Sequence, residues 1–314
     1  MRRRLKTFLH LTLALLALSA GDCLHARPSI PQAGAAARRS QTTSRARSQK
    51  VSPSPASVRR APERFFKDAI KFDGTLHFTD QKLGERSERY KYEIGLVYPR
   101  LAGGARPARV NSFNRTVAAV LKEVGNFRAW TQGTKDTRGK RPSEWADVFD
   151  TLYGDYDVTY ASDELISIRF DLYTFGWGAA RSTQHYLVFN YALASGRRLA
   201  LSDLFRPEAK YLRVIADFCV ADLRRQRKAV CENRDPRDCE PPSEISPTHP
   251  NLSPLPGNFR NWNLTRTGLL MNFDECRLAS CIEGEQFVTI PYAELKHLAP
   301  AKGIIAQLAQ GGNE

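Results

Sequence analysis

A short aromatic stretch in the middle of the chain carries the residue types that dominate binding surfaces. Aromatic anchors beside an arginine are enriched at the positions that contribute most binding energy. The stretch brings together Tyr173, Phe175, Trp177 and Arg181. Two glycines between them permit a tight turn. These four residues are our candidate ligand-binding residues. A second interpretation stays open, in which Phe175 and Trp177 only cap the hydrophobic core.

Residue types that support catalysis or metal binding do not converge on a motif. None of the six histidines forms a pair at helical spacing or a His-Glu pair that would hold a metal. The chain has no G-x-S-x-G nucleophile elbow and no Gly-rich phosphate loop. The sequence therefore predicts a protein that is not an enzyme, with no catalytic residue, cofactor or metal.

Five cysteines lie in the last third of the chain, and their spacing predicts two local disulfides. Cys231 and Cys239 flank a turn-rich loop that can bring its ends together. Cys276 and Cys281 would lie about 16 Å apart in one extended strand, so their pairing requires a turn between them. Cys219 sits on the apolar side of a helical pattern, and we expect it to be a buried free thiol.

The N-terminus has the three parts of a secretory signal peptide. Four positive charges within the first six residues precede an apolar run from Phe8 to Leu18, and small residues follow at 19–21. As a helix, this run would span about 16 Å, which is about half of a bilayer core of about 30 Å. We expect residues 1–26 to be a signal peptide and the mature protein to be periplasmic or secreted, in a compartment where cysteines pair.

Most of the net charge of +14 lies before the folded body. Residues 1–60 hold 12 Lys or Arg and one acid, so the rest of the chain is only slightly basic, which argues against a nucleic-acid partner. Residues 27–61 lack aromatic residues and a core-forming pattern, and we expect a disordered basic linker. This linker either contacts anionic membrane or wall polymers or acts as a solvated spacer, which we favour.

Hydrophobic periodicity predicts short strands with helices inserted between them. Strands are expected at 90–96, 155–161, 165–175, 183–193, 197–201, 269–273 and 286–291. Helices are expected at 110–124, ending at Gly125 ahead of a charged loop at 131–143, at 208–229, and from about Tyr292. The pattern predicts an α+β fold with mainly antiparallel sheets. We expect two closely packed modules, 62–163 and 164–300, and a tail at 301–314.

Ordered motifs across residues 85–300 resemble a known family. They are Tyr92–Pro99, Ile166–Phe170, Gly176–Ala180, Phe189–Tyr191, Gly196–Leu201 and Val288–Leu295. In their order and spacing they are similar to the paired extracytoplasmic modules of the lysozyme-receptor anti-sigma factor. Those modules also occur beside the catalytic domain of a peptidoglycan deacetylase. The family often has tyrosines near positions 276 and 281, where this chain has cysteines.

The resemblance implies a non-enzymatic α+β module of the cell envelope and supplies no catalytic residue. It implies a protein ligand, such as lysozyme, or a cell-wall glycan related to peptidoglycan. We therefore expect an exported binding module with one of these two partners. The alternative is an envelope polysaccharide hydrolase or a deacetylase accessory protein.

Overall fold

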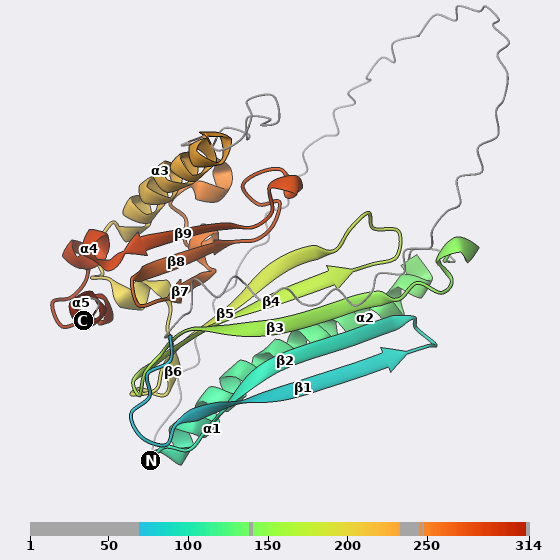
Figure 1. Ribbon diagram of the computed structural model, residues 1–314, viewed down its shortest axis with the longest axis horizontal. Coiled ribbons are helices and arrows are strands. Elements are labelled where there is room, and N and C mark those ends of the chain that lie inside the picture. The colour runs from blue at the N-terminus through green and yellow to red at the C-terminus, as the bar shows by residue number, and fades with distance from the viewer. Residues whose placement is uncertain (1–68, 138–140, 233–244, 247, 312–314) are drawn as a thin grey trace, which may run out of the picture. The chain divides into compact units, whose positions relative to one another are not determined.

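Two β-sheets organise the part of the chain that the computed structural model describes, which is residues 69–137, 141–232, 245–246 and 248–311 (Figure 1). The predicted signal peptide, the basic linker at 27–61 and the predicted pairing of Cys231 with Cys239 lie outside the described residues. The α+β prediction is confirmed, because helices accompany sheets whose neighbouring strands are antiparallel at every pairing but one.

The first sheet has six strands in the order of the sequence. They are β1 (His77–Ser87), β2 (Tyr92–Ala102), β3 (Asp150–Ala161), β4 (Leu165–Phe175), β5 (Thr183–Ala192) and β6 (Arg197–Arg198). Only β2 and β3 are parallel, because the chain crosses back between them through two helices, as parallel neighbours require. These helices are α1 (Pro107–Val117) and α2 (Leu121–Thr137), joined by a 3₁₀ turn at Ala118–Val120.

The second sheet has three antiparallel strands, β7 (Trp262–Leu264), β8 (Gly268–Phe273) and β9 (Gln286–Pro291). The helix α3 (Tyr211–Glu232) packs against β9 (Figure 1). Two short helices, α4 (Tyr292–Leu295) and α5 (Ile304–Gly311), pack against each other after the last strand. Residues 304–311 fall in the segment predicted as a tail, and Ile305 and Leu308 are buried in the second core.

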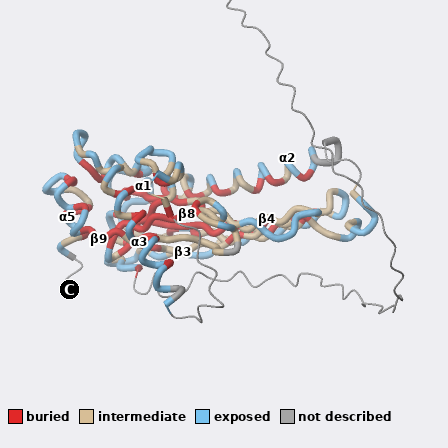
Figure 2. Tube along the Cα trace, turned by 90° about the horizontal axis from the view of Figure 1, so that it is seen from above, coloured by how far each residue is buried: buried red, intermediate tan, exposed pale blue. Residues whose placement is uncertain are grey.

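Each sheet has its own hydrophobic core. The first core lies between the six-stranded sheet and the helices α1 and α2, with Phe113, Val117 and Phe170 at its centre. The second core gathers α3, the three-stranded sheet and the C-terminal helices around residues such as Leu223 and Val288. Figure 2 shows the buried trace concentrated around α1, β3 and β8, with exposure rising toward the far end of β4.

Strand β4 is buried on both of its faces. Side chains alternate across a strand, and one face of β4 places Ile166, Ile168, Phe170 and Leu172 in the first core. The other face is polar and equally buried, with Ser167, Arg169 and Asp171. Two of them, Ser167 and Arg169, hydrogen-bond to the second sheet.

The helix that was predicted to end at Gly125 continues to Thr137, so its predicted end is wrong. The reason is that buried residues recur beyond the glycine, at Phe127 and Thr131, and their packing outweighs the low helix propensity of glycine. The charged loop predicted at 131–143 is therefore helical over its first half.

Strand β1 was missed because only Phe78 and Leu83 in it are strongly apolar. Strand β3 begins at Asp150 rather than at the predicted residue 155. The module boundary predicted between residues 163 and 164 coincides with the turn that joins β3 to β4, and both strands belong to one sheet.

Candidate binding groove

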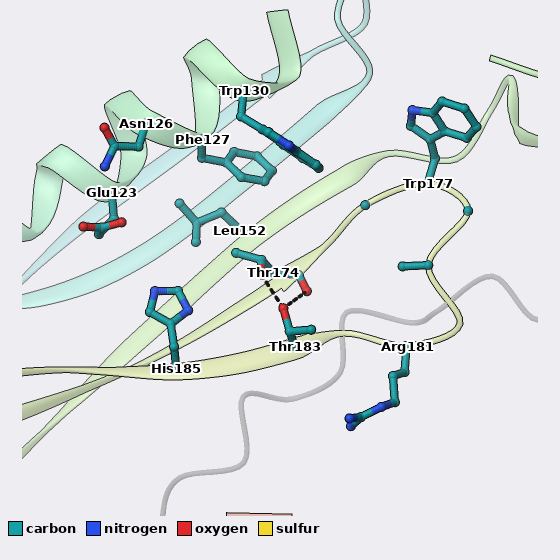
Figure 3. Close-up of a pocket in the computed structure, with 13 residues that line it drawn as sticks. Glu123, Asn126, Phe127, Trp130, Leu152, Thr174, Trp177, Arg181, Thr183 and His185 are labelled. Atoms are coloured by element: carbon teal, nitrogen blue, oxygen red, sulfur yellow. Dashed lines mark hydrogen bonds between the residues drawn. The ribbon is translucent and has the colours of Figure 1, made fainter. Parts of the chain in front are cut away.

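A groove of about 630 Å³ opens between α2 and the hairpin formed by β4 and β5 (Figure 3). Its helix wall consists of Glu123, Asn126, Phe127 and Trp130. Its strand wall and hairpin turn consist of Leu152, Thr174, Gly176, Trp177, Gly178, Ala179, Arg181, Thr183 and His185. The lining thus combines three aromatic side chains with carboxylate, amide, hydroxyl and imidazole groups.

The helix wall is one face of α2. Residues spaced by three, four and seven positions lie on the same side of a helix, which is the spacing of the four groove residues between 123 and 130. Phe127 is buried and contacts Trp130, with 5.5 Å between the ring centroids. Trp130 itself is 37% exposed. Figure 3 shows its indole pointing from α2 toward the side on which Trp177 lies.

The hairpin turn that carries Trp177 is anchored by a buried carboxylate. Asp150 accepts a hydrogen bond from the Trp177 backbone N–H at 2.6 Å. Asp150 also pairs with Arg141, with 3.0 Å between Nη2 and Oδ2. The Arg141 guanidinium lies 5.5 Å from the centroid of the Trp177 ring, over its face. Gly178 follows at a φ of +81°, which only glycine adopts without strain.

The strands supply polar groups to the floor of the groove. The hydroxyls of Thr174 and Thr183 lie 2.8 Å apart across the hairpin and hydrogen-bond to each other. His185 is two pairing steps further along β5, on the same side of the strand as Thr183, and points toward α2 in Figure 3. These hydroxyls and the imidazole can both donate and accept hydrogen bonds to a ligand.

Two of the four predicted ligand-binding residues lie at the groove. Trp177 and Arg181 line the groove, whereas Tyr173 and Phe175 do not. Tyr173 lies on the same face of β4 as Arg169 and Asp171. Burial raises the pKa of its phenol there, and the nearby charge of Asp171 raises it further. The groove residues on α2 were missed, because Phe127 and Trp130 lie beyond the glycine at which the helix was predicted to end.

The Arg181 guanidinium contacts two residues of the loop that follows β8. It pairs with Glu275, and its Nη2 lies 3.1 Å from Sγ of Cys276. Figure 3 shows the Arg181 side chain pointing away from α2. Glu275 also accepts from the backbone N–H of Gln184 at 3.4 Å. The hairpin is therefore tied to the loop that follows β8.

That loop contains the predicted disulfide between Cys276 and Cys281, which is confirmed, with 4.2 Å between the two Cα atoms. The chain bends at residues 277–279, between the two cysteines, which brings them together. Cys219 is a buried free thiol, also as predicted, and burial raises the pKa of its sulfhydryl group. A raised pKa keeps the thiol protonated and unreactive.

A cluster of buried charges lies on the opposite face of β4. The Arg169 guanidinium is 2% exposed and contacts Asp171 at 3.0 Å and Asp157 at 3.3 Å. It lies over the rings of Tyr186 and Phe287, at 5.0 and 4.9 Å from their centroids. Burial raises the pKa of Asp171 to about 7, although the positive charge of Arg169 opposes this shift.

A second polar cluster joins the two sheets around Ser167. Its hydroxyl accepts hydrogen bonds from the Leu264 backbone N–H at 3.0 Å and from the Asn263 side chain at 2.9 Å. It donates to Oδ1 of Asn190 at 2.6 Å. Asn190 in turn donates to the carbonyl of Trp262 at 2.7 Å. These bonds connect β4 and β5 to β7 through groups that are fully buried.

Two further properties concern only the residues that the structure describes. No helix among them combines the length and hydrophobicity that a bilayer crossing requires. Within the same ranges, no three His, Cys, Asp or Glu side chains are grouped so that they could hold a metal ion.

Residues 202–293 match the model of a family described as a protein of unknown function (DUF3298). A solved structure of a DUF3298 family member from Bacteroides fragilis NCTC 9343 aligns with a TM-score of 0.54 and 15% identity, covering 76% of this chain and 98% of that chain. A DUF3298 family protein from Pseudomonas aeruginosa PAO1 aligns with a TM-score of 0.43 and 14% identity, covering 72% and 94%. No curated protein matches the sequence. The chain therefore shares its fold with the Bacteroides fragilis protein and contains a segment that matches DUF3298.

Proposed function

We propose that this protein is an exported, non-catalytic binding module of the cell envelope that holds its ligand in the groove between α2 and the β4–β5 hairpin. The observation that carries the proposal is the lining of the groove. Trp130 and Trp177 stand on opposite walls, and polar side chains lie on the helix and the strands between them. Concave sites with aromatic walls and a few placed polar groups are typical of ligand binding.

The N-terminal leader and the disulfide support export to the periplasm or the medium. Disulfides persist in oxidising compartments and are rare in the cytosol, and the chain has the Cys276–Cys281 disulfide. The basic linker at 27–61 then serves as a spacer, or as a peripheral contact with anionic polymers of the membrane or wall. Because the body after residue 60 is nearly balanced in charge, we propose no nucleic-acid partner.

The resemblance to the paired extracytoplasmic modules of the lysozyme-receptor anti-sigma factor supports an envelope ligand. Two classes of partner fit that context, a lysozyme-like protein and a peptidoglycan-related glycan. The same modules accompany a peptidoglycan deacetylase, so an accessory role beside such an enzyme is the alternative. A turnover screen of the purified protein on chitooligosaccharides and muropeptides tests the non-catalytic part of the proposal, and any release of products would contradict it.

Retention on the insoluble envelope fraction of the producing cells tests the binding part. We expect the purified protein to sediment with this fraction and the Trp177→Ala variant to remain in the supernatant. Trp145→Ala is the matched control, because Trp145 is partly exposed but does not line the groove. Far-UV circular dichroism and urea unfolding verify that each variant is folded. If Trp177→Ala greatly lowers stability, the ring packs as part of the core and the proposal loses its support.

A further inference from the structure

Resting on the proposed function, we propose that the groove binds a short hexosamine oligosaccharide, neutral or cationic, and that Trp130 and Trp177 stack on its sugar rings. A pyranose ring has apolar C–H faces and a polar rim. It therefore fits a site that offers aromatic faces beside groups that donate and accept hydrogen bonds. The groove has this composition on both of its walls.

The two tryptophans come from elements far apart in the sequence and are held by different contacts. Trp130 rests on the buried ring of Phe127 and keeps 37% of its own surface exposed. Trp177 is covered on one face by the Arg141 guanidinium and still lines the groove. Both rings are thus preorganised, and a ligand that contacts them loses little side-chain entropy of the protein on binding.

The polar lining disfavours an entirely apolar occupant. Glu123, Asn126 and His185 face the groove together with the two threonine hydroxyls. A polar group buried by a ligand without a hydrogen-bond partner costs free energy. An acyl chain or the apolar face of a helix would leave the carboxylate, the amide and the imidazole without partners. Sugar hydroxyls can satisfy them, and an N-acetyl group matches the donor and acceptor of the Asn126 amide.

The charges around the groove disfavour an anionic sugar. Arg181 pairs with Glu275, and Arg141, which lies over Trp177, pairs with Asp150, so these two positive charges are already compensated. Within the described part of the chain, Glu123 has no ion-pair partner, and its carboxylate lines the groove. A uronate or a phosphate would be repelled by this carboxylate, whereas a neutral N-acetylhexosamine or a cationic hexosamine would be accepted.

The size of the groove fits a few sugar rings better than a folded protein surface. Its volume of about 630 Å³ lies within the range of about 300–1,000 Å³ that small-molecule sites occupy. A protein partner would have to reach it with an extended peptide. That outcome is the competing one in the experiment below.

Isothermal titration calorimetry with three soluble tetramers tests the proposal. The probes are N-acetylglucosamine tetramer, glucosamine tetramer and, as the anionic probe, galacturonate tetramer. We expect the two hexosamine tetramers to bind and the galacturonate tetramer not to bind. Trp130→Ala and Trp177→Ala should each weaken hexosamine binding about tenfold or more, as for an aromatic hot spot. Trp145→Ala should leave it unchanged.

Glu123→Gln separates the two hexosamines. We expect this variant to lose affinity for glucosamine tetramer and to keep its affinity for N-acetylglucosamine tetramer. Glu294→Gln, at an exposed glutamate on α4, is the matched control and should change neither affinity. Because Glu123→Gln keeps the size of the side chain, this readout holds even if a tryptophan variant fails to fold.

Sugar binding and the proposed function fail in different ways. If neither hexosamine tetramer binds, or if the galacturonate tetramer binds best, the hexosamine proposal is wrong. If retention on the envelope then persists, depends on Trp130 and Trp177, and disappears when the envelope is treated with protease, the groove binds a protein and the binding function stands. If retention is also absent, the proposed function itself is overturned.

Discussion

At the scale of single residues, the unusual feature is a strand whose polar face is buried. Arg169 and Asp171 alternate with core residues along β4, and both are at most 5% exposed. A buried charge is tolerated only where it is paired and hydrogen-bonded. Arg169 meets this condition through Asp157 and Asp171, and through its hydrogen bond of 3.2 Å to Asn272 on β8. For Asp171, burial outweighs the ion pair, since its pKa is raised to about 7.

This raised pKa predicts how stability changes with pH. An unfolded aspartate titrates near pH 3.9, so between about pH 4 and the folded pKa of about 7 the folded protein holds a proton that the unfolded chain has released. The free energy of unfolding must therefore fall as pH rises through this window. We expect Asp171→Asn, which cannot titrate, to show a smaller fall. Urea unfolding at a series of pH values from 4.5 to about 8 measures it.

Asp203→Asn is the control for this experiment. Arg197 lowers the pKa of Asp203, so the stability contributed by that carboxylate is present above its unfolded pKa and is lost only as pH falls through its folded pKa. The Asp203→Asn variant should therefore keep the fall between pH 4 and 7. An equal fall in Asp171→Asn and in the unmodified protein would mean that Asp171 is already ionised in the folded state throughout this range.

At the scale of elements, α2 forms the helix wall of the groove although a glycine interrupts its pattern. A Cβ at Gly125 would meet no heavy atom within 4 Å, and its backbone is helical. Gly125→Ala should therefore raise the free energy of unfolding by about 0.5–1 kcal/mol, because alanine restricts the unfolded chain and favours the helix. Urea unfolding of the two proteins side by side measures the difference.

Gly196→Ala provides the opposite case. Gly196 also has free space around it, but its φ is +70°, a conformation in which alanine is strained. We expect this variant to lose stability. If Gly125→Ala loses stability as well, α2 ends near Gly125 and the helix wall of the groove does not exist in solution.

The sequence predicted some elements of the fold closely and missed others. Strands β4, β5, β8 and β9 were predicted closely, because each has enough apolar residues to reveal its period. Strand β1 was missed because it lies at the sheet edge and exposes most of its side chains. A local pattern could not extend α2 past Gly125, since the packing of Phe127 against Tyr92 on β2 decides it.

The sequence pointed to the hairpin side of the groove and not to its helix wall. Trp177 and Arg181 stood out in one aromatic stretch, but the strand alternation that sends Tyr173 and Phe175 to the other face could have been applied to that stretch. The helix wall was beyond sequence reasoning. Trp130 and Trp177 line the same groove because α2 belongs to the crossover connection that links the parallel strands β2 and β3.

At the scale of the whole molecule, buried hydrogen bonds hold the two sheets against each other. The Ser167 hydroxyl accepts from the backbone of β7 and donates to Asn190 of β5. Asn263 of β7 also donates to the Ile168 carbonyl on β4 at 3.1 Å. Opening either sheet alone would leave these buried groups without partners, which is costly. We therefore expect the two sheets to unfold together.

Native-state hydrogen exchange followed by mass spectrometry tests this expectation on the intact chain. The slowest amides of β4 and of β8 should open with the same free energy, equal to that of global unfolding. Ser167→Ala removes the shared hydroxyl and should lower both opening energies by the same amount, about 1–3 kcal/mol. Sheets that unfold independently would behave differently, since β8 would open at a lower energy than β4 and Ser167→Ala would shift the two strands unequally. Equal opening energies and equal shifts would show that the groove-bearing sheet and the sheet of the DUF3298 segment unfold as one cooperative unit.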